Sequence, residues 1–219
     1  RQNTRRLLSL VNNLLDLQKQ ESGKTELHYS VFDLHEFMQE LYYNFQSVAQ
    51  NRTIDFRLQL PDTSFPVEYD RGELEKVIFN LLSNAFKFTP ENGTITLSAT
   101  LRPAKTTETT ETAKTEQDTK QETEQATEQR TNIPVPQNLC IEVKDNGIGI
   151  REEDRKKLFQ PFSASGKDLH GELLGSGIGL SVARSIVLRH KGTLSLRKAS
   201  PQGTVARVCL PYAPVTAAI

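Results

Sequence analysis

The chain has 219 residues, which suits one large domain or one domain with an appendage. Its apolar content of 36% is low for a compact globule, so we expect some stretch to remain unpacked. A formal net charge of +0 gives no broad attraction to nucleic acid or to an acidic membrane surface, and no apolar run approaches the ~20 residues that a spanning helix needs.

Residues 1–22 are predicted to form one helix with two leucine-rich seams, which Ser22-Gly23 would end. The first seam has 3-4-3 spacing and the second lies beside it: Leu7, Leu10, Leu14 and Leu17, then Leu8, Val11 and Leu15. Two seams suit a helical bundle, in which another helix or a second chain covers them; packing onto its own domain is the alternative. Because the pattern is already under way at Arg1, we expect a fragment of a longer protein.

Predicted strands and helices alternate in the next part of the chain. Strands are expected at 26–32, 53–60, 66–69 and 94–101. Asp33 and Asp70 are predicted to cap the helices that follow them, the first with Glu36 at its third position and the second running to about residue 88. The first helix is expected to bury Leu34, Phe37, Leu41 and Phe45.

Residues 102–137 differ in composition from the rest. From residue 102 to residue 132 there is no Val, Ile, Leu, Phe or Tyr, while Thr, Glu, Gln and Lys abound. Such a stretch cannot bury enough apolar surface to offset the entropy of ordering. We predict a disordered insertion in a hairpin loop, with flexible filler favoured over a binding role.

The second half predicts a strand at 138–145, a short helix near 152–157, a helix from about 177 to 190, and strands at 193–197 and 204–210 joined by a turn. Adjacent strands joined by turns favour an antiparallel or mixed sheet with helices on one face. The expected fold class is therefore α+β, a two-layer α/β sandwich, with residues 24–212 as one domain, residues 1–23 as a bundle helix and residues 213–219 as a tail or linker.

The two cysteines, Cys140 and Cys209, lie in strand-like runs without metal-type spacing. We expect two buried thiols, and a reducing compartment is the simpler interpretation.

A polar stripe on the helix predicted after Asp70 contains the first candidate binding residues. Asn80, Asn84 and Lys87 recur at i, i+3/i+4 spacing beside the buried face. An amide oxygen is a good ligand for Mg²⁺ and adds no negative charge near a triphosphate, and Lys87 could neutralise phosphate oxygens. Taken alone, the stripe also fits a solvated helix face.

Two glycine loops add to this. In 145–150, DNGIGI, Asp145 shares the inward parity of its strand, and the glycines allow close approach to a ligand. A buried carboxylate could accept from the adenine amine; a turn-initiating Asp is the alternative. In 175–180, GSGIGL leads into a helix and could bind an anion, although a lone G-x-G-x-G is weak support.

Four motifs occur in order: NLLSNAFKFTP at 80–90, DNGIGI at 145–150, LFQPF at 158–162 and GSGIGL at 175–180. This set resembles the ATP-binding domain of sensor histidine kinases, in the gyrase, heat-shock chaperone, histidine kinase and MutL (GHKL) superfamily. The N-terminal helix resembles the second helix of that family's dimerisation and phosphoacceptor domain. The resemblance implies ATP and Mg²⁺ as cofactors.

The resemblance implies roles at matching positions only. Asn84 would hold Mg²⁺ with Asn80 close to the phosphates, Lys87 would contact phosphate, and Asp145 would accept from adenine. The remaining expected site residues are Phe88 against the base, Gly147 and Gly149 shaping the pocket, Phe159 and Phe162 docking a mobile lid at 163–174, and Gly175, Gly177, Gly179 and Leu180 closing over the phosphates.

The family phosphorylates a histidine followed by an acidic residue on a bundle helix. His28, His35, His170 and His190 are not expected in that context, so the phosphoacceptor is predicted to be missing here. Superfamily ATPases carry a glutamate where Asn80 stands, so hydrolysis by this chain alone should be slow.

The expected function is donation of the γ-phosphoryl of Mg-ATP to a histidine in two-component signalling, with the isolated fragment inactive in autophosphorylation. A GHKL-type ATPase and a non-catalytic dimerisation or interaction module are the alternatives. Expected partners are the phosphoacceptor helix, a second protomer, and a response regulator or fused receiver domain, without nucleic acid or direct membrane contact. The resemblance implies the cytoplasmic part of a membrane-anchored bacterial sensor.

Overall fold

The structure, a computed structural model, describes residues 26–103, 137–154, 157–163 and 177–215. Several predictions concern residues outside these ranges: the bundle helix at 1–22, the insertion between residues 104 and 136, the lid from residue 164, Gly175, and residues 216–219 of the tail. Of the helices among the described residues, none is long and apolar enough to cross a membrane.

Three helices form one layer of the molecule. They are α2 (Leu34–Asn51), α3 (Arg71–Phe88) and α4 (Gly179–Arg189). Both predicted N-caps are confirmed, because Asp33 Oδ1 accepts from the Glu36 N–H at 3.0 Å and Asp70 Oδ1 accepts from the Glu73 N–H at 3.0 Å. The predicted apolar faces of α2 and α3 are buried.

Five strands form the main sheet, in the order β2-β4-β5-β7-β6. Their bounds are β2 (Asp55–Gln59), β4 (Thr94–Pro103), β5 (Gln137–Asp145), β6 (Thr193–Lys198) and β7 (Thr204–Tyr212). β2 pairs with β4 in parallel and the other pairs are antiparallel, so the sheet is mixed, as predicted. A separate two-stranded sheet pairs β1 (Ser30–Asp33) with β3 (Pro66–Tyr69), and this pairing was not predicted.

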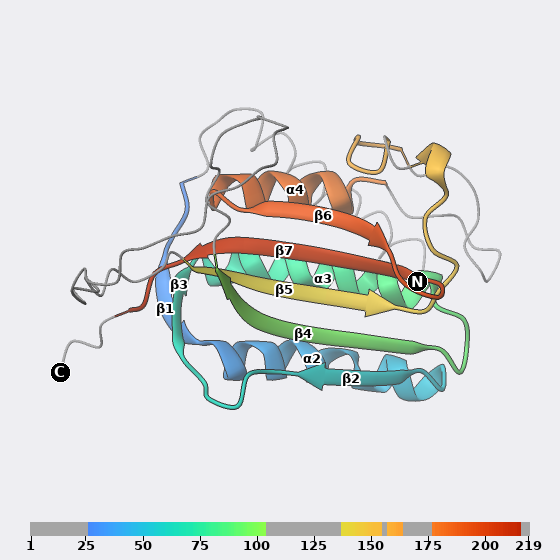
Figure 1. Cartoon of the computed structure of the whole chain (residues 1–219), viewed down its shortest axis with the longest axis horizontal. Coiled ribbons are helices and arrows are strands. Elements are labelled where there is room, and N and C mark those ends of the chain that lie inside the picture. The colour runs from blue at the N-terminus through green and yellow to red at the C-terminus, as the bar shows by residue number, and fades with distance from the viewer. Residues whose placement is uncertain (1–25, 104–136, 155–156, 164–176, 216–219) are drawn as a thin grey trace, which may run out of the picture.

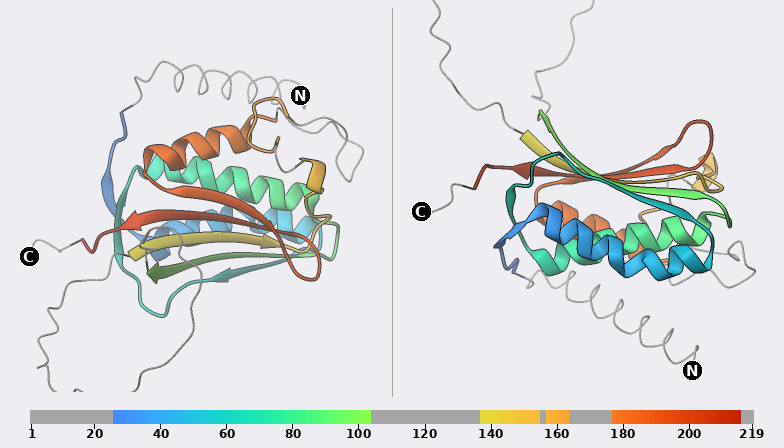
Figure 2. Two further views of the ribbon diagram at one scale, coloured as in Figure 1. Left: turned by 45° about the horizontal axis from the view of Figure 1, so that its top comes forward. Right: turned by 90° about the horizontal axis from the view of Figure 1, so that it is seen from below.

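The helices cover one face of the main sheet (Figures 1 and 2). Inward-facing side chains of the central strands are fully buried there, among them Ile95 and Leu97 of β4 and Ile141 of β5. On the other face Arg207 of β7 pairs with Glu142 of β5, and Arg102 of β4 reaches the same carboxylate at 3.1 Å. The predicted α+β sandwich is confirmed.

α3 and α4 are held together at one end by two polar contacts. Arg189 pairs with Glu73, and the Asp70 N–H donates to Nε2 of His190 at 3.3 Å. Because that ring nitrogen accepts, Nδ1 carries the proton and donates to the Ile186 carbonyl at 2.9 Å. His190 is buried in this arrangement, with both ring nitrogens hydrogen-bonded to backbone groups.

Some predicted boundaries were wrong. The short helix near 152–157 is a single 3₁₀ turn, η1 (Glu152–Asp154), and the strand expected at 26–32 begins only at Ser30, so His28 precedes it. The helix expected from 177 begins at Gly179, because Gly177 has a φ of 67°, which a right-handed helix does not allow.

The expectation of two separate thiols was also wrong. Cys140 and Cys209 are directly opposite each other on β5 and β7, with 4.1 Å between their Cα atoms, and they form a disulfide. The sequence could not show this, because pairing requires the register of strands that are 69 residues apart in the chain. The argument for a reducing compartment that rested on free thiols therefore no longer holds.

Candidate functional site

The two asparagines of α3 lie at the border of its buried face. Asn80 and Asn84 are both half-buried and stand one turn apart. Earlier on the same stripe, Glu73 pairs with Lys76 at 2.7 Å and with Arg189 of α4. The stripe is therefore a row of polar side chains that are partly exposed, with Glu73 bonded across to α4.

The glycine-rich loop before α4 packs directly against the first asparagine. A Cβ placed on Gly179 would lie 2.7 Å from Oδ1 of Asn80, closer than real Cβ contacts allow. A residue with a Cβ at this position would require the Asn80 amide to move. Ile178, the N-cap residue, makes no capping hydrogen bond with its side chain, which is apolar. The first turn of α4 thus presents backbone N–H groups beside Asn80.

Asp145 ends β5 with its carboxylate turned toward the helices, as its parity predicted. Its side chain is 7% exposed. Oδ1 accepts from the N–H of Gly147 at 2.9 Å and from that of Thr204 at 3.1 Å, whereas no donor within the described residues reaches Oδ2. Burial raises the pKa of Asp145, and these two hydrogen bonds only partly oppose that rise.

The loop after Asp145 is joined to the last turn of α3. The N–H of Ile148 donates to the carbonyl of Phe88 at 3.1 Å, and a Cβ on Gly147 would lie 2.3 Å from that same oxygen. The Lys87 ammonium lies 5.4 Å from the centre of the Phe88 ring. The structure therefore brings Asp145, Gly147, Lys87 and Phe88 together at one end of the molecule.

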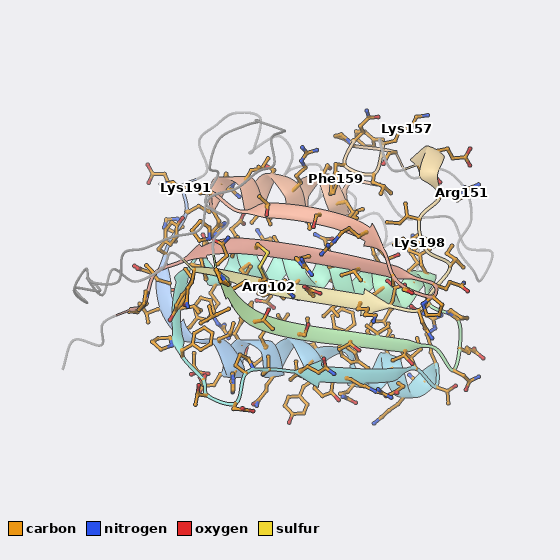
Figure 3. All side chains as sticks on the ribbon, viewed as in Figure 1. Arg102, Arg151, Lys157, Phe159, Lys191 and Lys198 are labelled. Carbon is orange, nitrogen blue, oxygen red and sulfur yellow. A yellow bond between two sulfur atoms is a disulfide. The ribbon has the colours of Figure 1, made fainter. Side chains whose placement is uncertain are left out.

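Of the two phenylalanines in the LFQPF motif at 158–162, only Phe159 makes a ring contact among the described residues. The guanidinium of Arg184, on α4, lies over the Phe159 ring at 5.0 Å, and Figure 3 shows Phe159 beside α4. Phe162 is 61% exposed and adopts a φ of 59°, and the described residues make no ring contact with it. Of the remaining predicted residues, Leu180 is half-buried and packs against the core.

Sequence reasoning missed two residues that contact Asp145. Gly203 has a φ of 107°, and a Cβ on it would lie 1.9 Å from the Asp145 carbonyl oxygen; the next residue, Thr204, donates to the carboxylate. Gly149, with a φ of 76°, faces the carbonyl of Gly203, which its own Cβ would meet at 3.3 Å. The sequence predicted a turn at 201–203 but held no signal that this turn meets DNGIGI.

The C-terminal end of α3 thus lies against the loop that follows the buried carboxylate of Asp145, and the Asn80 amide lies against the first residue of α4. A family model described as histidine kinase-, DNA gyrase B-, and HSP90-like ATPase matches residues 69–214. The chain belongs to this family. With its histidine kinase relatives, this match shows a GHKL ATP-binding domain of sensor histidine kinases, as the four motifs predicted.

Histidine kinase P4 of Formosa agariphila is 32% identical over 210 residues, covering 94% of this chain and 13% of that protein. Full-length ShkA in complex with AMPPNP has a TM-score of 0.69 at 20% identity, covering 97% of this chain and 37% of that one. ThkA in complex with the response regulator TrrA has a TM-score of 0.63 at 23% identity, covering 96% and 49%. The chain spans 12% to 30% of the length of eight curated relatives.

Proposed function

We propose that this histidine kinase domain binds Mg-ATP and donates the γ-phosphoryl group to a histidine of the full-length protein. One observation carries the proposal. The asparagine-bearing face of α3 is bounded by two glycine contacts, Gly179 against Asn80 and Gly147 against the carbonyl of Phe88, with the buried carboxylate of Asp145 beyond the second. At both contacts a Cβ on the glycine would come within 3.0 Å of its neighbour, so both positions lie tightly packed at the borders of this face.

The Asp145 end of this face fits an adenine ring. Oδ2, to which no described residue donates a hydrogen bond, can accept from an exocyclic amine while Oδ1 stays bonded to Gly147 and Thr204. Guanine presents a carbonyl at that position and would be repelled. Phe88 supplies an aromatic face, and stacking on such a face contributes about 1–3 kcal/mol in single-strand binding. ShkA, a structural neighbour, was solved with an ATP analogue.

The other end fits the phosphates and their cation. Within the described residues no three His, Cys, Asp or Glu side chains gather into a metal site, so Mg²⁺ would be held by the Asn84 amide oxygen together with phosphate oxygens and water. When bound, the cation neutralises charge on the phosphates. Lys87 adds a positive charge, and the N–H groups at the start of α4 lie beside Asn80, which is proposed to lie close to the phosphates.

The residues present favour transfer to another group over hydrolysis. The amide of Asn80 cannot accept a proton from water, so this chain's contribution is positioning and charge neutralisation. His35 is followed by Glu36, which matches the acceptor pattern, but its Nε2 is buried without a partner among the described residues. His190 is buried between two helices. The acceptor is therefore proposed to lie outside the described part of the chain.

The wider setting follows from the same proposal. We infer a homodimer in the full-length protein, with residues 1–23 as part of the dimerisation helices, and a response regulator or receiver domain as the phosphoryl acceptor from histidine. ThkA was solved with such a regulator. A cytoplasmic location in a membrane-anchored bacterial sensor is part of this proposal.

Phosphoryl transfer tests the donor role. The full-length protein is incubated with γ-labelled ATP and Mg²⁺, and acid-labile, base-stable protein phosphate is measured. Asn84→Ala is expected to reduce labelling by about 100-fold or more, since it removes the proposed cation ligand. Asn44→Ala, on the exposed side of α2, is the control and should label like the wild type. Equal labelling of the Asn84 variant, with both variants folded by circular dichroism, would refute the assignment.

A further inference from the structure

Arg52 joins the ends of two helices. Its backbone N–H caps α2, donating to the carbonyls of Val48 and Ala49 at 3.2 and 3.3 Å. Its guanidinium reaches α3, where NH1 donates to the carbonyl of Phe86 and NH2 to the carbonyl of Thr89 at 2.8 Å. One side chain thus satisfies two carbonyls at the C-terminal end of α3, where helix carbonyls lack partners of their own.

A third carbonyl of this segment, that of Phe88, is bonded to a different part of the chain. Phe88 O accepts from the N–H of Ile148, in the loop that follows Asp145. The carbonyls of residues 86, 88 and 89 are therefore fixed by Arg52 and by the DNGIGI loop together. Lys87 and Phe88, proposed to contact phosphate and base, lie within this fixed segment.

We propose that Arg52 is a positioning residue of the nucleotide site: it holds the last turn of α3 so that Lys87 and Phe88 meet the ligand. A guanidinium suits this task because its planar fork can serve two acceptors at once, whereas a lysine ammonium is a point charge on a flexible stem. The positive charge also lies at the negative end of the α3 dipole. The inference rests on the proposed nucleotide site and adds a residue 28 positions before Asn80 that no motif includes.

Calorimetric titration with AMPPNP and Mg²⁺, well below the melting temperature of each variant, tests this role. Arg52→Met keeps the apolar stem but loses both hydrogen bonds, and its affinity is expected to fall about tenfold or more. Arg52→Lys keeps one donor and the charge, so its affinity should lie between the two. Arg57→Met is the matched control, because Arg57 is an exposed partner of Asp55 on β2 and should bind like the wild type.

A double-mutant cycle separates positioning from a general loss of stability. If Arg52 acts through the segment containing Phe88, Arg52→Met should cost much less affinity in a Phe88→Ala background than in the wild type. Additive losses, or wild-type affinity in either Arg52→Met or Arg52→Lys, would overturn the inference. Should Arg52→Met fail to fold, Arg52→Lys and its cycle with Phe88→Ala decide. Absence of binding by the wild type would instead contradict the proposed function.

Discussion

Asp145 is the residue at which burial and function oppose each other. In the proposed site its charged carboxylate accepts from an adenine amine, yet burial raises its pKa above the ordinary value for aspartate. A raised folded-state pKa gives stability that is present below the unfolded pKa and is lost as pH rises through the folded pKa. The unliganded domain is therefore less stable at neutral pH than it would be with a neutral group at this position.

Asp145→Asn is expected to raise the free energy of unfolding at pH 7 and to leave it little changed below the ordinary aspartate pKa. The amide oxygen can still accept from Gly147 and Thr204, so the fold is kept. Chemical denaturation of the unliganded protein between pH 3.5 and 8 measures this. A variant that is less stable than the wild type at pH 7, by a margin that grows with pH, would contradict this view of the carboxylate.

A substitution at Gly179 is also expected to affect nucleotide binding and folding stability differently. Gly179→Ala should change the free energy of unfolding by less than about 1 kcal/mol, because the helix propensity of alanine and the close contact with Asn80 oppose each other. It should also weaken AMPPNP binding, because the new methyl displaces the Asn80 amide. Gly72→Ala, in the first turn of α3, is the matched control, since its Cβ would meet only Asp70 Oδ1 at 3.8 Å. Equal affinities of the two variants would show that the Gly179–Asn80 contact has no part in binding.

The sequence allowed a prediction of which residues within a motif are buried or face the candidate site. It did not allow a prediction of the distant residues that contact the motif only in the folded chain. Asp145 was predicted from its parity and the glycines after it, because both signals lie within a few positions. Gly203 and Arg52 lie 58 and 34 residues from the groups they contact, Asp145 and Phe86. Only the strand order and the approach of α2 to α3 bring them there, and neither can be read from local sequence.

At the scale of elements, the helix N-caps and the buried helix faces could be predicted from the sequence, whereas the pairing of the strands could not. Asp33 and Asp70 cap their helices because the capping hydrogen bond is local. Asp70 also accepts from the distant N–H of His28. Burial alone would raise its pKa, but the backbone hydrogen bonds outweigh burial and the pKa is lowered. The parallel pairing of β2 with β4 and the separate β1–β3 sheet depend on long-range register instead.

The link between β5 and β7 gives an element-scale prediction. The Cys140–Cys209 disulfide closes a sequence separation of 69 residues, and the chain-entropy account assigns such a loop up to about 4 kcal/mol. Reduction with dithiothreitol should therefore lower the denaturation midpoint of the oxidised wild type. The Cys140→Ser/Cys209→Ser double variant is the control and should not respond to reductant. An unchanged wild-type midpoint, with reduction verified by thiol titration, would contradict the stabilising role of the bond.

At the scale of the whole molecule, the proposed site draws on both layers. The sheet would supply Asp145 and the turn that bonds to it, while the helical layer, α3 and α4 in Figure 1, would supply Asn84 and the start of α4. The α+β sandwich could be predicted because adjacent strands joined by turns leave few architectures. Its strand order, which decides what lies beside Asp145, required the structure.

Titration calorimetry of AMPPNP with Mg²⁺ against Asp145→Asn tests the central claim most directly. The wild type should bind one equivalent, and Asp145→Asn should lose about 1–3 kcal/mol of binding free energy, because the adenine amine loses its acceptor. Asp62→Asn, in an exposed loop, removes the same charge elsewhere and should bind like the wild type. Binding of equal affinity by the wild type and Asp145→Asn, or no binding by the folded wild type, would contradict the account.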